Sequence, residues 1–170
     1  MEVVKILVEK GADIHAKNEE AVRMAAAKGH LEVVKYLVGR GANIHTDNDY
    51  ALREAAYFGY LDVVKFLIED LDADIHSCND YAVRWAATNG HLEVVKFLVS
   101  KDANIHAFNN EAVKLAARND HLEVVKFLVE NGADIHADND KALQWAAEKD
   151  HLDVVTYLVS IGANKINYSC

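Results

Sequence analysis

The stretch from Asn79 to His106, NDYAVRWAATNGHLEVVKFLVSKDANIH, decides the fold, because nearly all of the remaining chain consists of further copies of it. Each copy carries a Val-Val pair before Lys or Thr, and this pair recurs every 30 or 31 residues. A fixed period of this length indicates a solenoid of stacked units, none of which can bury its apolar face alone. The pairs begin at Val3, Val33, Val63, Val94, Val124 and Val154.

Every copy contains two segments with helical spacing. In the first, apolar pairs recur as in Ala51-Leu52 and Ala55-Ala56, which places them on one face of a helix and predicts close packing against a neighbour. In the second, residues 92–98 have an apolar residue every third position. A glycine such as Gly90, or an aspartate in its place, predicts the end of the first helix, because both tolerate left-handed backbone. The asparagines that open each copy are predicted to cap the first helix: Asn18, Asn48, Asn79, Asn109 and Asn139.

The blocks GHLEVVK (90–96) and GADIH (132–136), with the Ala-Ala pairs that end each first helix, resemble ankyrin repeats over the whole chain. The resemblance implies an all-α solenoid of stacked antiparallel helix pairs that binds a partner protein through its concave helix face and has no catalytic activity. Ankyrin repeats usually run about 33 residues and open with Thr-Pro-Leu-His. Here that tetrad reads Tyr50-Ala51-Leu52-Arg53, and the chain has no proline. The turns should therefore be shortened, and this 30-residue form resembles the repeats abundant in large DNA viruses of amoebae.

The copies predict one ankyrin-repeat domain over residues 1–170. Because the chain opens on a second helix, the apolar side of residues 1–8 should be uncovered, so we expect fraying or self-association there. The third copy has one extra residue in 69–72, which predicts a local bulge, and residues 164–167 depart from the usual repeat ending. The expected units are a half repeat at 1–15 and full repeats at 16–45, 46–76, 77–106, 107–136 and 137–170.

The net charge of −9 argues against a nucleic-acid partner, since binding to phosphates depends on clustered Lys and Arg. No apolar run is long enough to span a bilayer, so we expect no membrane association and a location in the cytoplasm or nucleus, of the host cell if the source is viral. The two cysteines, Cys78 and Cys170, are too few for a disulfide framework and lack metal-ligand spacing, which predicts free thiols.

Nine histidines suggest a metal site, because five of them recur in register. However, helices of adjacent repeats pack about 8–10 Å apart, whereas zinc ligands lie about 2.0–2.1 Å from the ion. We therefore expect no metal and predict that these histidines hydrogen-bond to backbone in the turns. The chain shows no phosphate-binding loop, nucleophile elbow or zinc motif, so we expect no cofactor and no catalytic residue. The ladder is His15, His45, His76, His106 and His136.

A second ladder is cationic. Each member lies four residues after Glu19, Asp49, Asp80 or Asn110. An acid placed four residues before a base stabilises its own helix, which we prefer to a phosphate-binding role. The ladder is Arg23, Arg53, Arg84 and Lys114.

Partner binding is expected at positions that vary between copies while the frame stays constant. Positions spaced i, i+4 and i+7 or i+8 in the first helix share the face opposite the alanines. Aromatic residues gather on this face, and such residues dominate binding hot spots. For the two tryptophans an alternative is that they fill space between helices, because Met24 and Leu115 take the same position elsewhere. The predicted partner-binding residues are Tyr50, Glu54, Tyr57, Phe58, Tyr81, Trp85, Thr88, Phe108, Arg118 and Trp145.

A second hypothesis for function is a structural protein that assembles with itself through uncapped terminal repeats. The two hypotheses differ in solution. Self-assembly predicts a mass that rises with concentration, whereas a binding module predicts a monomer that captures a different protein.

Overall fold

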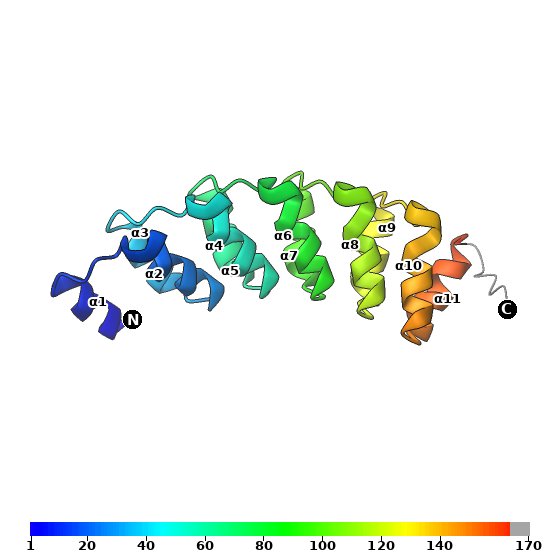
Figure 1. The fold of residues 1–170 in the computed structure, drawn as a ribbon, viewed down its shortest axis with the longest axis horizontal. Coiled ribbons are helices and arrows are strands. Elements are labelled where there is room, and N and C mark those ends of the chain that lie inside the picture. The colour runs from blue at the N-terminus through cyan, green and yellow to red at the C-terminus, as the bar shows by residue number, and fades with distance from the viewer. Residues whose placement is uncertain (164–170) are drawn as a thin grey trace.

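The computed structural model of this chain describes residues 1–163; the end of the last predicted repeat, with residues 164–167 and Cys170, lies outside them. The described part contains eleven helices and no strand (Figure 1). The predicted all-α repeat solenoid is therefore confirmed. Over the same residues, none of the helices is both long and apolar enough to cross a membrane.

The chain forms a single helix, α1 (Glu2–Glu9), followed by five helix pairs. Each pair lies within one sequence repeat and is joined by a short turn. The pairs are α2 (Ala16–Ala27) with α3 (Leu31–Val38), α4 (Thr46–Tyr57) with α5 (Leu61–Glu69), α6 (Ser77–Thr88) with α7 (Leu92–Ser100), α8 (Ala107–Arg118) with α9 (Leu122–Glu130), and α10 (Ala137–Glu148) with α11 (Leu152–Ser160).

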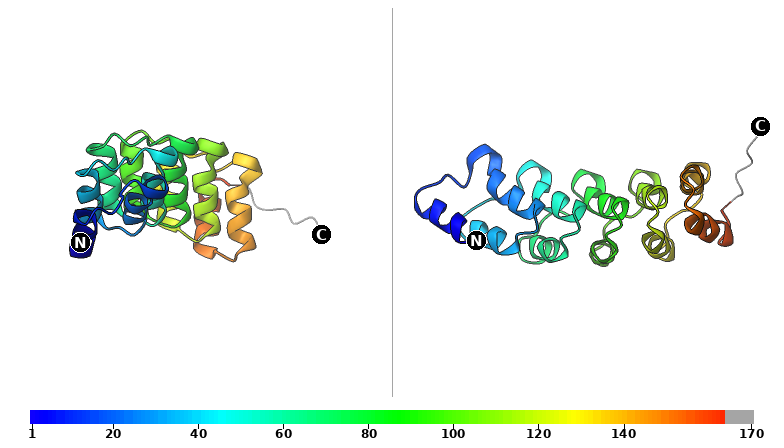
Figure 2. Two further views of the ribbon diagram at one scale, coloured as in Figure 1. Left: turned by 60° about the vertical axis from the view of Figure 1, so that its left-hand side comes forward. Right: turned by 90° about the horizontal axis from the view of Figure 1, so that it is seen from below.

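The pairs stack side by side, so that first helices form one row and second helices another (Figure 2). The first helices pack closely on one another, because alanines such as Ala55, Ala56 and Ala86 are fully buried between them. The second helices contact each other much less and bury leucines such as Leu67 and Leu98 toward the first row. The first row therefore presents a nearly continuous surface built from the first helix of every full repeat.

The first helices end as the sequence predicts. Gly90 has φ +75° and donates its N–H to Ala87 O at 3.2 Å, while the next N–H, of His91, bonds Ala86 O at 2.9 Å. This pair of bonds satisfies carbonyls that the helix would otherwise leave open. Asp120 and Asp150 replace the glycine in the last two repeats and adopt the same left-handed conformation, with φ 64° and 60°.

The predicted asparagine caps are wrong. In each repeat the Asn is the middle of three consecutive left-handed residues, as in Cys78 (φ 53°), Asn79 (φ 56°) and Asp80 (φ 55°). None of the five Asn side chains accepts a helix N–H, and the right-handed helix begins only after the third left-handed residue. Asn is favoured here because it tolerates left-handed backbone better than most residues. We call each three-residue segment a left-handed turn: 17–19, 47–49, 78–80, 108–110 and 138–140.

The extra residue of the third copy produces the predicted bulge. In the other copies the alanine after the second helix bonds a carbonyl five residues back, as Ala103 N–H does to Leu98 O at 3.0 Å. In the third copy Ala73 N–H bonds Leu67 O, six residues back, also at 3.0 Å. Asp72, with φ 53°, provides the left-handed residue that Asp102 supplies in the next copy and glycine in the others.

The apolar face of α1 is exposed, as expected. No residue of α1 is buried, and Val3 and Leu7 are 69% and 53% exposed. Fraying and self-association at this end stay predictions.

Two glycines with positive φ, Gly90 and Gly132, allow a test of the contact between repeats. A Cβ at Gly90 would lie 2.5 Å from Nδ1 of His121 in the next repeat, whereas a Cβ at Gly132 (φ +95°) would meet nothing within 4 Å. Gly132→Ala should cost about 1 kcal/mol from left-handed strain alone. Gly90→Ala should cost about 1–3 kcal/mol more, because the histidine ring must move. Urea unfolding midpoints measure both.

The double variant Gly90→Ala, His121→Ala should recover part of that extra cost. Equal destabilisation by the two single glycine variants would show that the ring of His121 does not restrain the neighbouring helix end.

Candidate functional site

The arginines of the cationic ladder donate hydrogen bonds to carbonyls of the left-handed turns. The predicted pairs with acids four residues earlier are therefore wrong. Arg53 donates from Nε to Asn48 O at 3.0 Å and from Nη2 to Asp47 O at 2.7 Å. Arg84 repeats both bonds with Asn79 O and Cys78 O, at 2.9 and 3.0 Å. Three left-handed residues point their carbonyls away from the helix ladder, and the guanidinium supplies the missing donors.

The same cations reach into the next repeat. Arg23 Nη1 donates to Asp47 at 3.2 Å, Arg84 pairs with Glu111, and Lys114 pairs with Asp138. The hydrogen bond from Lys114, followed by one from Asn109, lowers the pKa of the Asp138 carboxyl below its usual value. Arg23 and Arg84 thus connect a left-handed turn to an acid of the following repeat, whereas Arg53 bonds only its turn and Lys114 only the acid.

Aromatic rings lie between these cations. The guanidinium carbons of Arg23 and Arg53 lie 4.9 and 5.4 Å from the centroid of Tyr50. Those of Arg53 and Arg84 lie 5.2 and 5.9 Å from the centroid of Tyr81, distances at which a cation is attracted to the ring face. Arg84 also lies 4.4 Å from the centroid of Phe108. Cations and rings therefore alternate along the first row from Arg23 to Phe108.

Arg84 is 7% exposed, and its loss would remove the guanidinium donor of the Cys78 and Asn79 carbonyls. Arg84→Met should destabilise the protein by about 2–4 kcal/mol, because it removes the donors of two turn carbonyls and the partner of Glu111. Gln144 holds the equivalent position in the last repeat and donates Nε2 to Asn139 O at 2.7 Å. Arg84→Gln should therefore cost less than Arg84→Met in urea unfolding. The same cost for both variants would rule out the turn bond as the source of stability.

A cluster of rings lies on the exposed side of α4 and α6. The ring centroid of Tyr57 is 4.8 Å from Phe58 and 5.8 Å from Trp85, and Trp85 is 5.4 Å from Tyr81. All four side chains are partly exposed, and Phe58 reaches 45%. The residues come from adjacent repeats, so the stacking of α4 on α6 assembles the cluster. We call the following set the aromatic face: Tyr50, Glu54, Tyr57, Phe58, Tyr81 and Trp85.

Glu54 lies among these rings, one helical turn from both Tyr50 and Tyr57. Partial burial raises the pKa of its carboxyl above the ordinary 4.5, and the positive charge of Arg53 opposes this only in part. Burial likewise raises the pKa of Tyr81, and the nearby charge of Glu54 adds to the shift. The aromatic face therefore holds an acid that is less well solvated than a surface carboxylate.

An acid with a raised pKa in the folded state binds its proton more tightly there than in the unfolded chain. Ionised Glu54 therefore opposes folding above its folded pKa, and this cost disappears below the unfolded value. Glu54→Gln should raise the free energy of unfolding at pH 7, measured by urea titration. The gain should be less than about 1 kcal/mol, because the side chain is still partly solvated. Below pH 4.5 the variant and the parent should unfold alike. A difference independent of pH would contradict desolvation as its cause.

The other predicted binding residues lie apart from this cluster. Thr88 is only 8% exposed and donates its hydroxyl to Arg84 O at 2.8 Å. Arg118 and Lys141 each place their charge 5.4 Å from the ring centroid of Trp145, in the last two repeats. Phe108, 58% exposed, is connected to the aromatic face through Arg84, which also lies over Tyr81.

Sequence reasoning missed Tyr60, whose ring centroid is 6.3 Å from Phe58. The available signal was that Tyr60 replaces the histidine found at this position in every other full repeat. It also missed Glu111 as a partner of Arg84, because that pair joins two repeats.

The histidines that end each repeat bond to side chains, which corrects the predicted backbone bonds. Each Nδ1 lies 2.7–2.9 Å from an acceptor four residues later, as in His15 with Glu19 and His106 with Asn110. The hydrogen bond that Glu19 accepts from the His15 ring raises the pKa of His15. By contrast, two of the histidines before the second helices do reach backbone: His91 Nε2 lies 3.0 Å from Tyr57 O, and His151 Nε2 lies 2.9 Å from Arg118 O. Across residues 1–163 no three His, Cys, Asp or Glu side chains converge as metal ligands.

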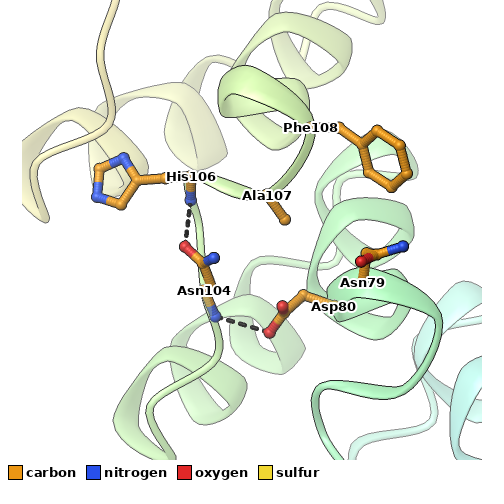
Figure 3. Close-up of a pocket in the computed structure, with 6 residues that line it drawn as sticks. All are labelled: Asn79, Asp80, Asn104, His106, Ala107 and Phe108. Carbon is orange, nitrogen blue, oxygen red and sulfur yellow. Dashed lines mark hydrogen bonds between the residues drawn. The ribbon is translucent and has the colours of Figure 1, made fainter.

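A pocket of about 400 Å³ lies beside Phe108, between the turns of the third and fourth repeats (Figure 3). Asp80 Oδ1 accepts the N–H of Asn104 at 2.8 Å, and Asn104 Oδ1 accepts the N–H of His106 at 2.9 Å. Since Asp80 and Asn104 already have these partners, the pocket offers shape beside Phe108 and no reactive group.

Two rows of stacked helices, with each unit contacting only its neighbours, define a helical repeat solenoid. The chain belongs to the ankyrin-repeat family: the model "Ankyrin repeats (3 copies)" matches residues 1–77, 52–139 and 83–169. Ankyrin repeats are generally protein–protein interaction modules and typically have no catalytic activity. No curated protein matches the chain significantly.

Proposed function

We propose that this protein is a non-catalytic module that binds a partner protein through the aromatic face. The observation that carries the proposal is the group of contacting rings from Tyr57, Phe58, Tyr81 and Trp85, which stays partly exposed while the repeated frame around it is buried. Large rigid rings bury much area with little loss of conformational entropy, as in known binding hot spots. Phe108, Thr88, Arg118 and Trp145 lie outside this face, and we propose them only as further contacts with the same partner.

The charge of the protein indicates the class of its partner. The net charge of −9, and the engagement of Arg23, Arg84 and Lys114 with acids, favour a protein over a nucleic acid as partner. We place the protein inside the cell, in cytoplasm or nucleus. The 30-residue period and the lack of proline support an origin among the shortened repeats of large DNA viruses of amoebae, in which case the cell is that of the host.

Affinity capture from a lysate of the cells that contain the protein tests the aromatic face. Wild-type protein should retain a partner that the double variant Tyr57→Ala, Trp85→Ala loses, because the variant removes the two central rings of the cluster. Bound proteins are identified by mass spectrometry, and circular dichroism checks that helicity is unchanged.

Tyr157→Ala is the matched control, because Tyr157 lies on α11 in the second row. It should capture the same partner as the wild type. Equal capture by the double variant would mean that another face binds. Failure of every variant and of the wild type to capture a protein would count against the binding module.

The second candidate is a structural protein that assembles through its terminal repeats. The observation in its favour is the exposed apolar side of α1, with Met1, Val3, Ile6 and Leu7 between 43% and 69% exposed. Multi-angle light scattering separates the two candidates, since assembly requires a mass that rises with protein concentration.

A further inference from the structure

The rings on the first row of helices differ in whether the chain itself supplies a cation. Tyr50, Tyr81 and Phe108 each have a guanidinium within 6 Å of the ring centroid, and Trp145 has two cations. Among the described residues no Lys or Arg lies over the ring of Tyr57 or Trp85.

Glu54 is an acid beside these two rings whose charge no cation of the described residues pairs with. Its carboxylate makes no ion pair and no hydrogen bond within residues 1–163. The neighbouring Arg53 does not pair with it, because that guanidinium donates to the carbonyls of Asp47 and Asn48 and lies between two tyrosine rings. Desolvation, which raises the pKa of Glu54, makes the missing counter-charge costly.

These elements meet at one place. Glu54 is three residues before Tyr57 on α4, so both point to the same side of the helix. Trp85 occupies on α6 the position that Glu54 occupies on α4, and its ring contacts those of Tyr57 and Tyr81. An acid beside ring faces that no cation covers is the arrangement that binds an ammonium or guanidinium group.

We propose that the aromatic face recognises a basic side chain, Lys or Arg, of its partner, with the cation held against Trp85 and Tyr57 and paired with Glu54. The inference rests on the proposed function and names the chemistry of the partner. The overall charge of −9 agrees with it, since an acidic protein attracts a basic segment. The aromatic rings surround the cation on the apolar side, and Glu54 supplies the charge that a wholly apolar partner would leave unpaired.

Trp145 provides an internal control. Its ring already lies 5.4 Å from Arg118 and 5.4 Å from Lys141, so the place that a partner cation would take is filled. The chain has only these two tryptophans, and their indole N–H signals can be followed separately.

The test is a titration of ¹⁵N-labelled protein with Nα-acetyl-lysine methylamide, followed through the two indole N–H signals. We expect a saturable shift at Trp85 and none at Trp145. The neutral Nα-acetyl-norleucine methylamide, at the same ionic strength, should shift neither signal. Glu54→Gln should weaken lysine binding about two- to fivefold while the protein stays folded.

Several results would overturn the inference. They are equal shifts at both tryptophans, an equal effect of the norleucine compound, the absence of a lysine-induced shift at Trp85, and unchanged affinity in Glu54→Gln. The capture experiment separates this failure from that of the proposed function. If Glu54→Gln retains the partner fully while Tyr57→Ala, Trp85→Ala loses it, binding through the aromatic face is supported. Recognition of a basic side chain by Glu54 is then rejected.

Discussion

The fold depends on a left-handed turn at the start of every full repeat. Three consecutive residues with positive φ cost about 1–2 kcal/mol each for side chains other than glycine. Proline, with φ fixed near −65°, is excluded from these positions. Arg53 and Arg84 offset the cost by donating to the turn carbonyls, and the third residue of the turn accepts from a histidine and, at Asp80, from the N–H of Asn104 in the same repeat's exit turn.

Those same arginines link stability to the binding surface. Once a guanidinium is fixed by the turn, its two faces are free to contact rings, and Tyr50 and Tyr81 take these places. Tyr81 in turn contacts Trp85, and Trp85 contacts Tyr57, on the exposed side of the first row. A frame that repeats in every copy therefore carries an aromatic face that occurs in only two of them.

The sequence was sufficient for the all-α class, the helix ends at Gly90 and Asp120, and the bulge before Ala73, because each follows from residue types at fixed spacing. It failed at Asn79, since the same residue type suits a helix cap and a left-handed turn. It also failed for Arg84, whose acid partner by spacing was Asp80, whereas the guanidinium reaches Glu111 of the next repeat. Spacing within a helix carries no information on contacts between helices.

By itself the sequence determined the repeat, its helical period and the positions that vary, because these depend only on which residues recur. Only the tertiary structure decided which rings meet and which charges stay unpaired. Trp85 and Trp145 look alike in the sequence, yet one contacts Tyr57 and Tyr81 and the other lies against two cations. The difference arises because stacking brings residues of adjacent repeats, about 30 positions apart, within a few ångströms of each other.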